Sequence, residues 1–148
     1  YVLGEHGDSE VLHWSGALAG AVPVVRFAGD VGREITPDVK QQIDEGVRNA
    51  AARIIQGKGA TWYGIGAGMA RIAQAVLNDE NAILTCSRVH EDVCGVERVA
   101  LSLPAIVNAS GVAHVLRPPL DASEEAALRR GASILAEACQ SLSRLSHG

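Results

Sequence analysis

Residues 82–116, AILTCSRVHEDVCGVERVALSLPAIVNASGVAHVL, contain three strand candidates in succession and decide the class of fold. The candidates are, in order, 82–89, 99–103 and 111–116. The first is rich in apolar and β-branched residues, and in the second apolar and polar residues alternate. Polar residues and a glycine at 91–95 indicate a turn between them, while Pro104 weakens the far end of the second strand.

Helical spacing of apolar residues outside this stretch predicts three principal helices, near 36–57, 61–78 and 122–145. Thr36-Pro37 supplies a hydroxyl N-cap and a first-turn proline, and Asp121 with Glu124 resembles a capping box. Strands, two helices, strands and a helix do not alternate strictly. The sequence therefore predicts an α+β fold with a twisted, mostly antiparallel sheet. No internal repeat or linker divides the chain, so residues 1–148 are expected to form one domain.

Composition restricts the class of protein. The 148 residues are 47% hydrophobic and 20% charged, which is typical of a folded globular domain. A net charge of −4 disfavours a nucleic-acid or anionic-membrane partner, and no apolar run approaches the roughly 20 residues that span a bilayer. Three cysteines without C-x-x-C spacing favour the cytoplasm. The chain opens at Tyr1 within an apparent strand, so we expect it to be a piece of a longer protein.

The glycine-rich stretch 64–70, GIGAGMA, invites a dinucleotide-binding interpretation. Its third glycine falls one position early, and the residues before it are not an apolar strand. No strand ending in an acid follows about 20 residues later. Small residues that let a helix pack closely against another element are the better explanation. We expect the phosphates of any nicotinamide cofactor to be held elsewhere.

The stretch 2–11, VLGEHGDSEV, places His6 between two glycines in a charged loop. Imidazole titrates near neutral pH and functional residues concentrate on loops, so an acid–base catalyst is one interpretation. A solvated loop residue is another, and a metal ligand acting with His13 is a third. The two histidines lack a recognisable ligand spacing. Gly4 and Gly7 favour function, because bare backbone lets a substrate approach the ring closely.

Several motifs in the same order resemble the L-lactate/malate dehydrogenase family. GEHGDSE at 4–10 resembles the active-site loop of that family, and KGAT at 58–61 with YGIG at 63–66 resembles its second substrate-side element. NDENA at 78–82, the turn at 95–96 and the Leu-Pro pair at 103–104 continue the match. It covers essentially the whole chain. The chain is most similar to the C-terminal, substrate-binding and catalytic half of bacterial L-lactate dehydrogenases, without the N-terminal Rossmann domain.

The resemblance implies roles for three residues and NAD as the cofactor. His6 would be the proton donor and acceptor between pyruvate and L-lactate, Thr61 would line the substrate pocket, and Ile65 would contact the nicotinamide ring. Thr61 and Ile65 are four positions apart at a helix start, so their side chains point the same way. Ile65 as an ordinary core residue is an alternative. No metal is expected. The implied partners are pyruvate or L-lactate, the NAD-binding domain, and further copies in a dimer or tetramer.

Two other functions stay open. A malate dehydrogenase would share the mechanism; Glu5, Glu10 and Thr61 resemble the lactate side, but the deciding residue lies on a loop of the absent half. A non-catalytic interaction or metal-binding domain on the same fold would use His6 as a surface residue or ligand. In the dehydrogenases, the aspartate that partners the histidine and the carboxylate-binding arginine also belong to the absent half. The chain alone is therefore predicted to have no dehydrogenase activity.

Overall fold

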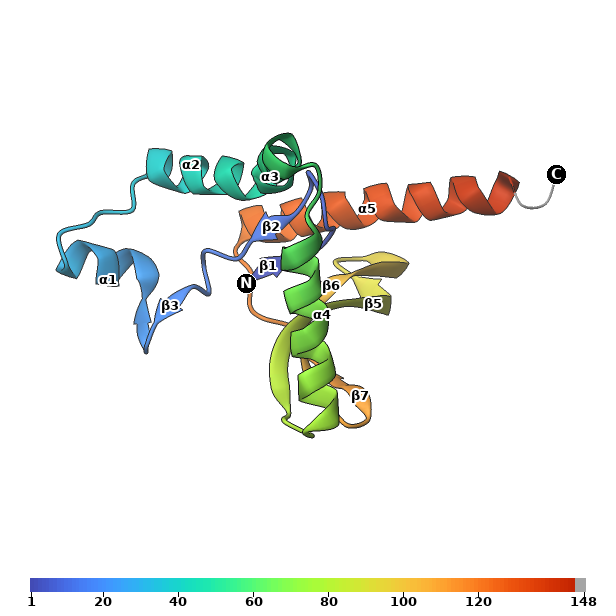
Figure 1. Ribbon diagram of the computed structural model, residues 1–148. Coiled ribbons are helices and arrows are strands. Elements are labelled where there is room, and N and C mark those ends of the chain that lie inside the picture. Colours follow the sequence, from blue (N-terminus) through green and yellow to red (C-terminus); the bar gives the residue numbers. More distant parts are fainter. Residues whose placement is uncertain (146–148) are drawn as a thin grey trace.

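The computed structural model describes residues 1–145 (Figure 1). Its strands are β1 (Val2–Leu3), β2 (Val11–Leu12), β3 (Leu18–Ala19), β4 (Val22–Pro23), β5 (Ala82–Val93), β6 (Val96–Asn108) and β7 (Gly111–Val115). Its helices are α1 (Val24–Asp30), α2 (Pro37–Arg48), α3 (Ala50–Lys58), α4 (Trp62–Leu77) and α5 (Ala122–Leu145). Every strand pairing in the described residues is antiparallel, which confirms the predicted α+β class.

The sheet predicted from residues 82–116 forms in the order β5-β6-β7. Cys94 and Gly95 turn the chain between β5 and β6, with positive φ angles of 51° and 80°. Strand β6 continues through Pro104 rather than weakening there. The carbonyl of Pro104 accepts the backbone N–H of Leu116 at 2.8 Å, so its nitrogen faces the end of β7. The missing N–H therefore costs only the last bond of the β6–β7 ladder.

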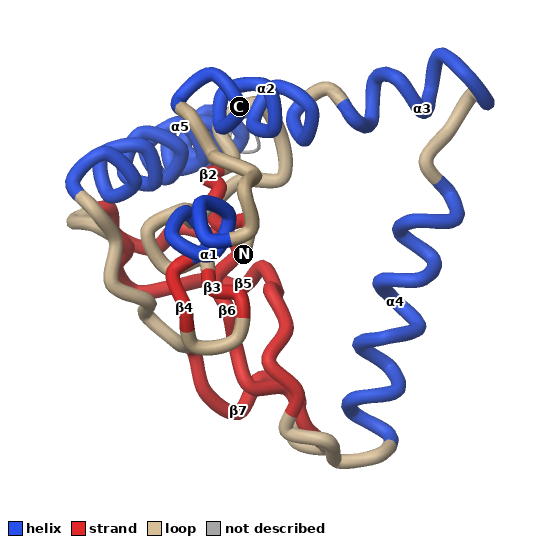
Figure 2. Tube along the Cα trace, turned by 90° about the vertical axis from the view of Figure 1, so that its left-hand side faces the viewer, coloured by secondary structure: helices blue, strands red, loops and turns tan. Residues whose placement is uncertain are grey.

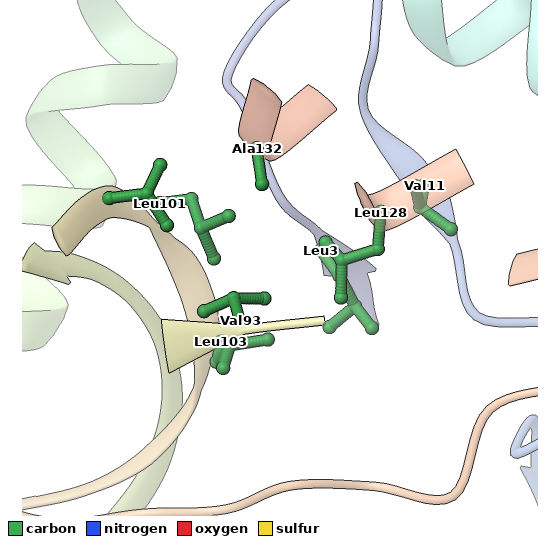
Figure 3. Close-up of a cluster of buried hydrophobic side chains, with 8 residues drawn as sticks. Leu3, Val11, Val93, Leu101, Leu103, Leu128 and Ala132 are labelled. Carbon is green, nitrogen blue, oxygen red and sulfur yellow. The ribbon is translucent and has the colours of Figure 1, made fainter. Parts of the chain in front are cut away.

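One hydrophobic core lies between the β1–β2 hairpin, the sheet and helix α5 (Figure 3). The hairpin contributes Leu3 and Val11, β5 and β6 contribute Val93, Val99, Leu101 and Leu103, and α5 contributes Leu128 and Ala132. Gly4 adds a backbone link, because its N–H and its carbonyl each bond to Ser102 at 2.8 Å. Both strands of the short hairpin are therefore anchored on the core.

The helices differ from the prediction at two places. The helix predicted near 36–57 is two helices, because Asn49 interrupts it with φ −89° and ψ 2°. The carbonyl of Glu45 accepts both the side-chain amide of Asn49 at 2.8 Å and its backbone N–H at 3.0 Å, so the side chain adds a local bond where α2 ends. Helix α1 was not among the three predicted helices, whereas α5 begins and ends where expected. Within residues 1–145, no helix combines the length and apolar character needed to cross a membrane.

We call helices α2, α3 and α4, residues 37–77, the arm. Figure 2 shows α3 and α4 extending to one side of the core, whereas α2 lies beside α5. Neither α2 nor α3 buries a residue, and α4 buries Ala75 alone. Gly64, Gly66 and Gly68 lie within α4, which follows helix α3 rather than a strand. A Cβ on any of these glycines would meet no atom within 4 Å. The close helix packing predicted for them is therefore not formed within the described part of the chain.

Candidate active site

The loop that carries His6 connects the two strands of a hairpin. Strands β1 and β2 pair Val2 with Leu12 and Leu3 with Val11. Leu3 and Val11 are buried in the core, and the side chain of His6 is exposed between them. Alternation along each strand thus turns one apolar residue inward on either side of the loop. The imidazole is therefore exposed to solvent, while the two strands that carry its loop are anchored in the core.

Hydrogen bonds within the loop close it on itself. The Ser9 hydroxyl donates to the Glu5 carboxylate, and the backbone N–H of Glu10 donates to the carbonyl of Gly7 at 3.1 Å. The Glu5 carboxylate lies over Gly7, where a Cβ would come within 2.9 Å of its Oε1. A side chain at position 7 would therefore have to displace the Glu5 carboxylate, and the glycine also leaves the backbone beside His6 bare.

The second group of predicted residues lies where α3 ends and α4 begins. Gly59 ends α3 in the left-handed conformation, with φ 88°, and its N–H bonds to the carbonyl of Ile55 at 2.7 Å. Thr61 occupies the N-cap position of α4, but its side chain makes no capping hydrogen bond. Ile65 follows one turn later and is 59% exposed, so it is not an ordinary core residue of this chain.

His6, Thr61 and Ile65 line one open hollow of about 440 Å³. Ala51, Ile54, Lys58 and Gly64 complete its lining. The hollow therefore combines an imidazole, a hydroxyl and an ammonium group with an apolar wall. The structure brings the three predicted site residues together, although the roles assigned to them stay predictions.

Four lining residues of the hollow were not among the predicted site residues: Gly64 on α4 and three residues on α3. Ala51, Ile54 and Lys58 follow one another at intervals of three and four, which places them on one face of α3. That spacing was the signal that could have found them. Lys58 is also part of the KGAT motif, and its Nζ lies 4.6 Å from the centroid of the Tyr63 ring.

His13 lies outside the hollow, in a buried polar cluster. It is 4% exposed, and its Nδ1 is 3.1 Å from Oε2 of Glu124 at the start of α5. Burial acts to raise the pKa of the Glu124 carboxyl, but hydrogen bonds from Ser15, from the backbone N–H of Asp121 and from His13 outweigh it. The pKa of Glu124 is therefore below its ordinary value. In residues 1–145, no three His, Cys, Asp or Glu side chains meet in a group that could hold a metal ion.

Known proteins resemble the chain over nearly all its length. The model of the lactate/malate dehydrogenase alpha/beta C-terminal domain matches residues 1–144. The L-lactate dehydrogenase of Thermus aquaticus is 56% identical over 142 residues, which are 96% of this chain and 46% of that protein. The L-lactate dehydrogenase of Allorhizobium ampelinum is 51% identical over 135 residues, 91% of this chain and 44% of that protein.

Solved structures give the same picture. MGS-M5, a lactate dehydrogenase from a Medee basin deep-sea metagenome library, superposes with a TM-score of 0.86 at 40% identity, covering 93% of this chain and 44% of that one. The minor L-lactate dehydrogenase of Enterococcus mundtii superposes with a TM-score of 0.85 at 35% identity, covering 93% and 43%. The chain spans less than half the length of the relatives it matches.

Proposed function

The chain belongs to the lactate/malate dehydrogenase family, and we propose that residues 1–148 are the C-terminal, substrate-binding and catalytic domain of an NAD-dependent L-lactate dehydrogenase. The observation that carries the proposal is the meeting of His6, Thr61 and Ile65 in one hollow. These residues come from two segments far apart in the sequence. Each is of the type that the interconversion of pyruvate and L-lactate requires at its position.

His6 is the proton donor and acceptor of the proposed reaction. When bound, NADH supplies a hydride to the carbonyl carbon of pyruvate. The protonated imidazole of His6 gives its proton to the carbonyl oxygen, which becomes the hydroxyl of L-lactate. In the opposite direction, neutral His6 takes that hydroxyl proton. An imidazole can both give and take a proton, which serves both directions, and its exposure at the loop leaves it accessible to substrate.

Thr61 and Ile65 form the opposite wall of the hollow. The Thr61 hydroxyl makes no capping bond and can face the substrate, while the exposed side chain of Ile65 offers an apolar surface to the nicotinamide ring. These residues fit the ring of NAD but not its phosphates. Gly66 and Gly68 lie in the interior of α4, where backbone N–H groups belong to the helical ladder and cannot cradle an anion. The phosphates therefore bind to the cofactor half.

The exposed apolar side of the arm is covered by that cofactor half in the complete enzyme. Trp62 is 69% exposed and Met69 is 61% exposed, and both lie on the helix that carries Ile65. A surface of this kind is costly in water and typical of a contact with another chain or domain. The relatives are more than twice as long as the matched region, so each has a further half available for this contact.

The complete enzyme is a homo-oligomer, a tetramer or a dimer, that acts in the cytoplasm at the fermentative end of glycolysis. Oligomers are common among dehydrogenases of this family, and closed symmetric assemblies are the usual form of soluble oligomers. Cys86 and Cys94 carry free thiols, and burial raises the pKa of each, so both stay protonated. Unpaired thiols suit a reducing compartment. Light scattering at micromolar concentration, applied to the fusion enzyme described next, tests the assembly.

A fusion enzyme tests the activity. Residues 1–148 are joined to the cofactor-binding half of the Thermus aquaticus L-lactate dehydrogenase, in place of that enzyme's own C-terminal half. We expect NADH oxidation with pyruvate, and a much lower kcat/KM with oxaloacetate. The isolated chain should neither oxidise NADH nor bind pyruvate measurably, because the groups that hold the substrate carboxylate and the cofactor phosphates are absent.

The outcomes separate the alternatives. The deciding loop residue comes from the grafted half in this fusion, so its substrate preference is compared with that of the parent Thermus aquaticus enzyme. A shift toward oxaloacetate relative to that parent would favour the malate-type substrate for residues 1–148. Stoichiometric binding of Zn²⁺ by the isolated chain, lost in His6→Ala, would favour the metal-binding alternative. Turnover by the isolated chain would mean that a cofactor site exists within residues 1–148. It would contradict the proposal that the cofactor binds to the other half of the enzyme.

A further inference from the structure

Helix α5 runs along the hairpin that carries His6 (Figure 1), and three positions on one face of it contact the hairpin or the segment that directly follows it. Glu124, Leu128 and Gly131 are separated by four and three residues, the spacing of one helix face. None of them lines the hollow. Leu128 and Gly131 nevertheless contact the two ends of the His6 loop, and Glu124 contacts the chain just after β2.

Gly131 lies against the C-terminal end of the loop. A Cβ at this position would be 3.0 Å from the hydroxyl oxygen of Ser9 and 3.3 Å from its backbone oxygen. Ser9 itself donates its hydroxyl hydrogen to Glu5, the residue directly before His6. A glycine costs stability in the middle of a long helix. Here it permits a close approach between the helix and the backbone of the catalytic loop.

Leu128 lies against the N-terminal end of the loop. Gly4 has a φ of 90°, and a Cβ there would be 3.1 Å from Cδ1 of Leu128. Because Gly4 is also bonded to Ser102 through both of its backbone groups, the loop leaves the core at a defined point. Gly4 and Ser9, which flank His6, are thus both packed against α5.

Glu124 fixes the chain just beyond the hairpin. Its carboxylate accepts the backbone N–H of Ser15 at 2.8 Å and the hydroxyl of Ser15 at 2.5 Å. It also bonds to Nδ1 of His13 at 3.1 Å and accepts the backbone N–H of Asp121 at 3.2 Å. The carboxylate is 6% exposed with its oxygens satisfied, and a buried charge of this kind is costly to disturb. The segment that follows β2 is therefore tied to the first turn of α5.

We propose that helix α5 sets the position of His6 through two positioning residues that never touch the substrate. Gly131 acts through the loop itself, and Glu124 acts through the segment that follows β2. This rests on the proposed function for its catalytic consequence, and on the contacts above for its structural part. The proton donor is held by a helix remote from the hollow, so the geometry of proton transfer depends on the register between α5 and the hairpin.

Gly131→Ala in the fusion enzyme tests the catalytic consequence. The new methyl group pushes the loop by a few tenths of an ångström. Since a misplacement of about 1 Å can cost roughly 10²-fold in rate, we expect kcat to fall about 10-fold. The KM for NADH should stay unchanged, and the solvent deuterium isotope effect on kcat should rise because proton transfer becomes slower. A purely structural role would leave kcat and the isotope effect unchanged in protein that remains folded.

Two further variants control for the substitution itself. Gly46→Ala makes the same gain in helix propensity in α2, where its Cβ would lie 3.6 Å from Nη2 of Arg53, an ordinary contact. It should leave kcat unchanged. Ser9→Ala removes the closest atom facing position 131. The double variant should therefore lose less activity than the product of the two single losses, which is the signature of a direct contact.

A second readout does not depend on activity. In the 148-residue chain, Gly131→Ala should shift the ring resonances of His6 and the amide resonances of residues 5–10 in NMR spectra, while those of α4 stay in place. Unchanged loop resonances would overturn the proposal. Shifted resonances with an unchanged kcat would overturn it as well. Shifted resonances in a chain whose fusion never turns over would contradict the proposed function and leave the structural part standing. If Gly131→Ala does not fold, Glu124→Gln takes its place with the same expected shifts.

Discussion

In the body of the chain, which comprises the β1–β2 hairpin, the β5–β7 sheet and α5, Leu101 is 1% exposed; in the arm, Met69 is 61% exposed. The two regions nevertheless share the candidate active site, since the body supplies His6 and the arm supplies Thr61 and Ile65. His6, the proposed proton donor, lies on a hairpin anchored in this chain's own core. Thr61 and Ile65, the proposed contacts of substrate and cofactor, belong to a region whose large apolar side chains are exposed in this chain. The candidate site thus combines residues from a region with its own buried core and residues from a region whose apolar side chains are largely exposed.

The largest expected effect separates the two regions by chemistry. In the fusion enzyme, His6→Asn should lower kcat by about 10²–10⁴-fold, the usual contribution of a positioned acid–base group. Thr61→Ala should act mainly on the KM for pyruvate and on selectivity, because it removes a contact present in both ground and transition states. Steady-state kinetics measure both. Near-normal turnover by the His6 variant would refute its proposed role.

The second prediction separates the regions by stability. In the isolated chain, Leu101→Ala should lower the free energy of unfolding by about 2–5 kcal/mol, because it leaves a cavity in the core. Met69→Ala should change it by no more than about 0.5 kcal/mol, since an exposed side chain away from packing contacts contributes little. Urea denaturation followed by circular dichroism measures both. If Met69→Ala were as costly as Leu101→Ala, the arm would be packed in a way that this structure does not have.

A smaller effect concerns the link between α5 and the hairpin. The pKa of Glu124 is lowered in the folded chain, so its ionised form contributes stability above the ordinary value of 4.5. That contribution is lost as pH falls below 4.5 through the lowered pKa. Glu124→Ala should lower the free energy of unfolding by about 1–3 kcal/mol at pH 7, because it leaves buried donors without an acceptor. It should also reduce the loss of stability as pH falls below 4.5. Glu137→Ala, an exposed position on the same helix, is the matched control.

The smallest effect concerns His90, a buried histidine of the body. Burial lowers its pKa from the ordinary 6.5, and the charges of Arg88 and Arg117 act in the same direction against the bond to the Leu101 carbonyl. The unfolded chain therefore takes up a proton more readily as pH falls below 6.5, and the folded state loses stability there. His90→Gln should flatten the decline in stability below about pH 6.5. An unaltered pH profile of the thermal midpoint would contradict this assignment.

The sequence by itself determined the elements whose signals are local. Alternation and turn residues placed the three strands of 82–116, and a capping pattern with helical spacing placed α5 at its observed ends. The charged glycine-flanked loop singled out His6. Local signals failed at Asn49, where the backbone leaves the helical conformation although the helical spacing of apolar residues continues. They failed again at Pro104, where the position of β7 decides what the missing N–H costs.

Only the tertiary structure decided which distant residues meet. No local pattern relates Glu124 to His13 and Ser15, or Gly131 to Ser9, because each pair is joined by packing of α5 against the hairpin. The hollow likewise depends on tertiary structure. The hairpin anchored on the core supplies His6, and the arm places residues 51–65 next to it. Propensity acts over a few neighbouring residues, whereas contacts at long separation depend on how the buried faces of whole elements fit together.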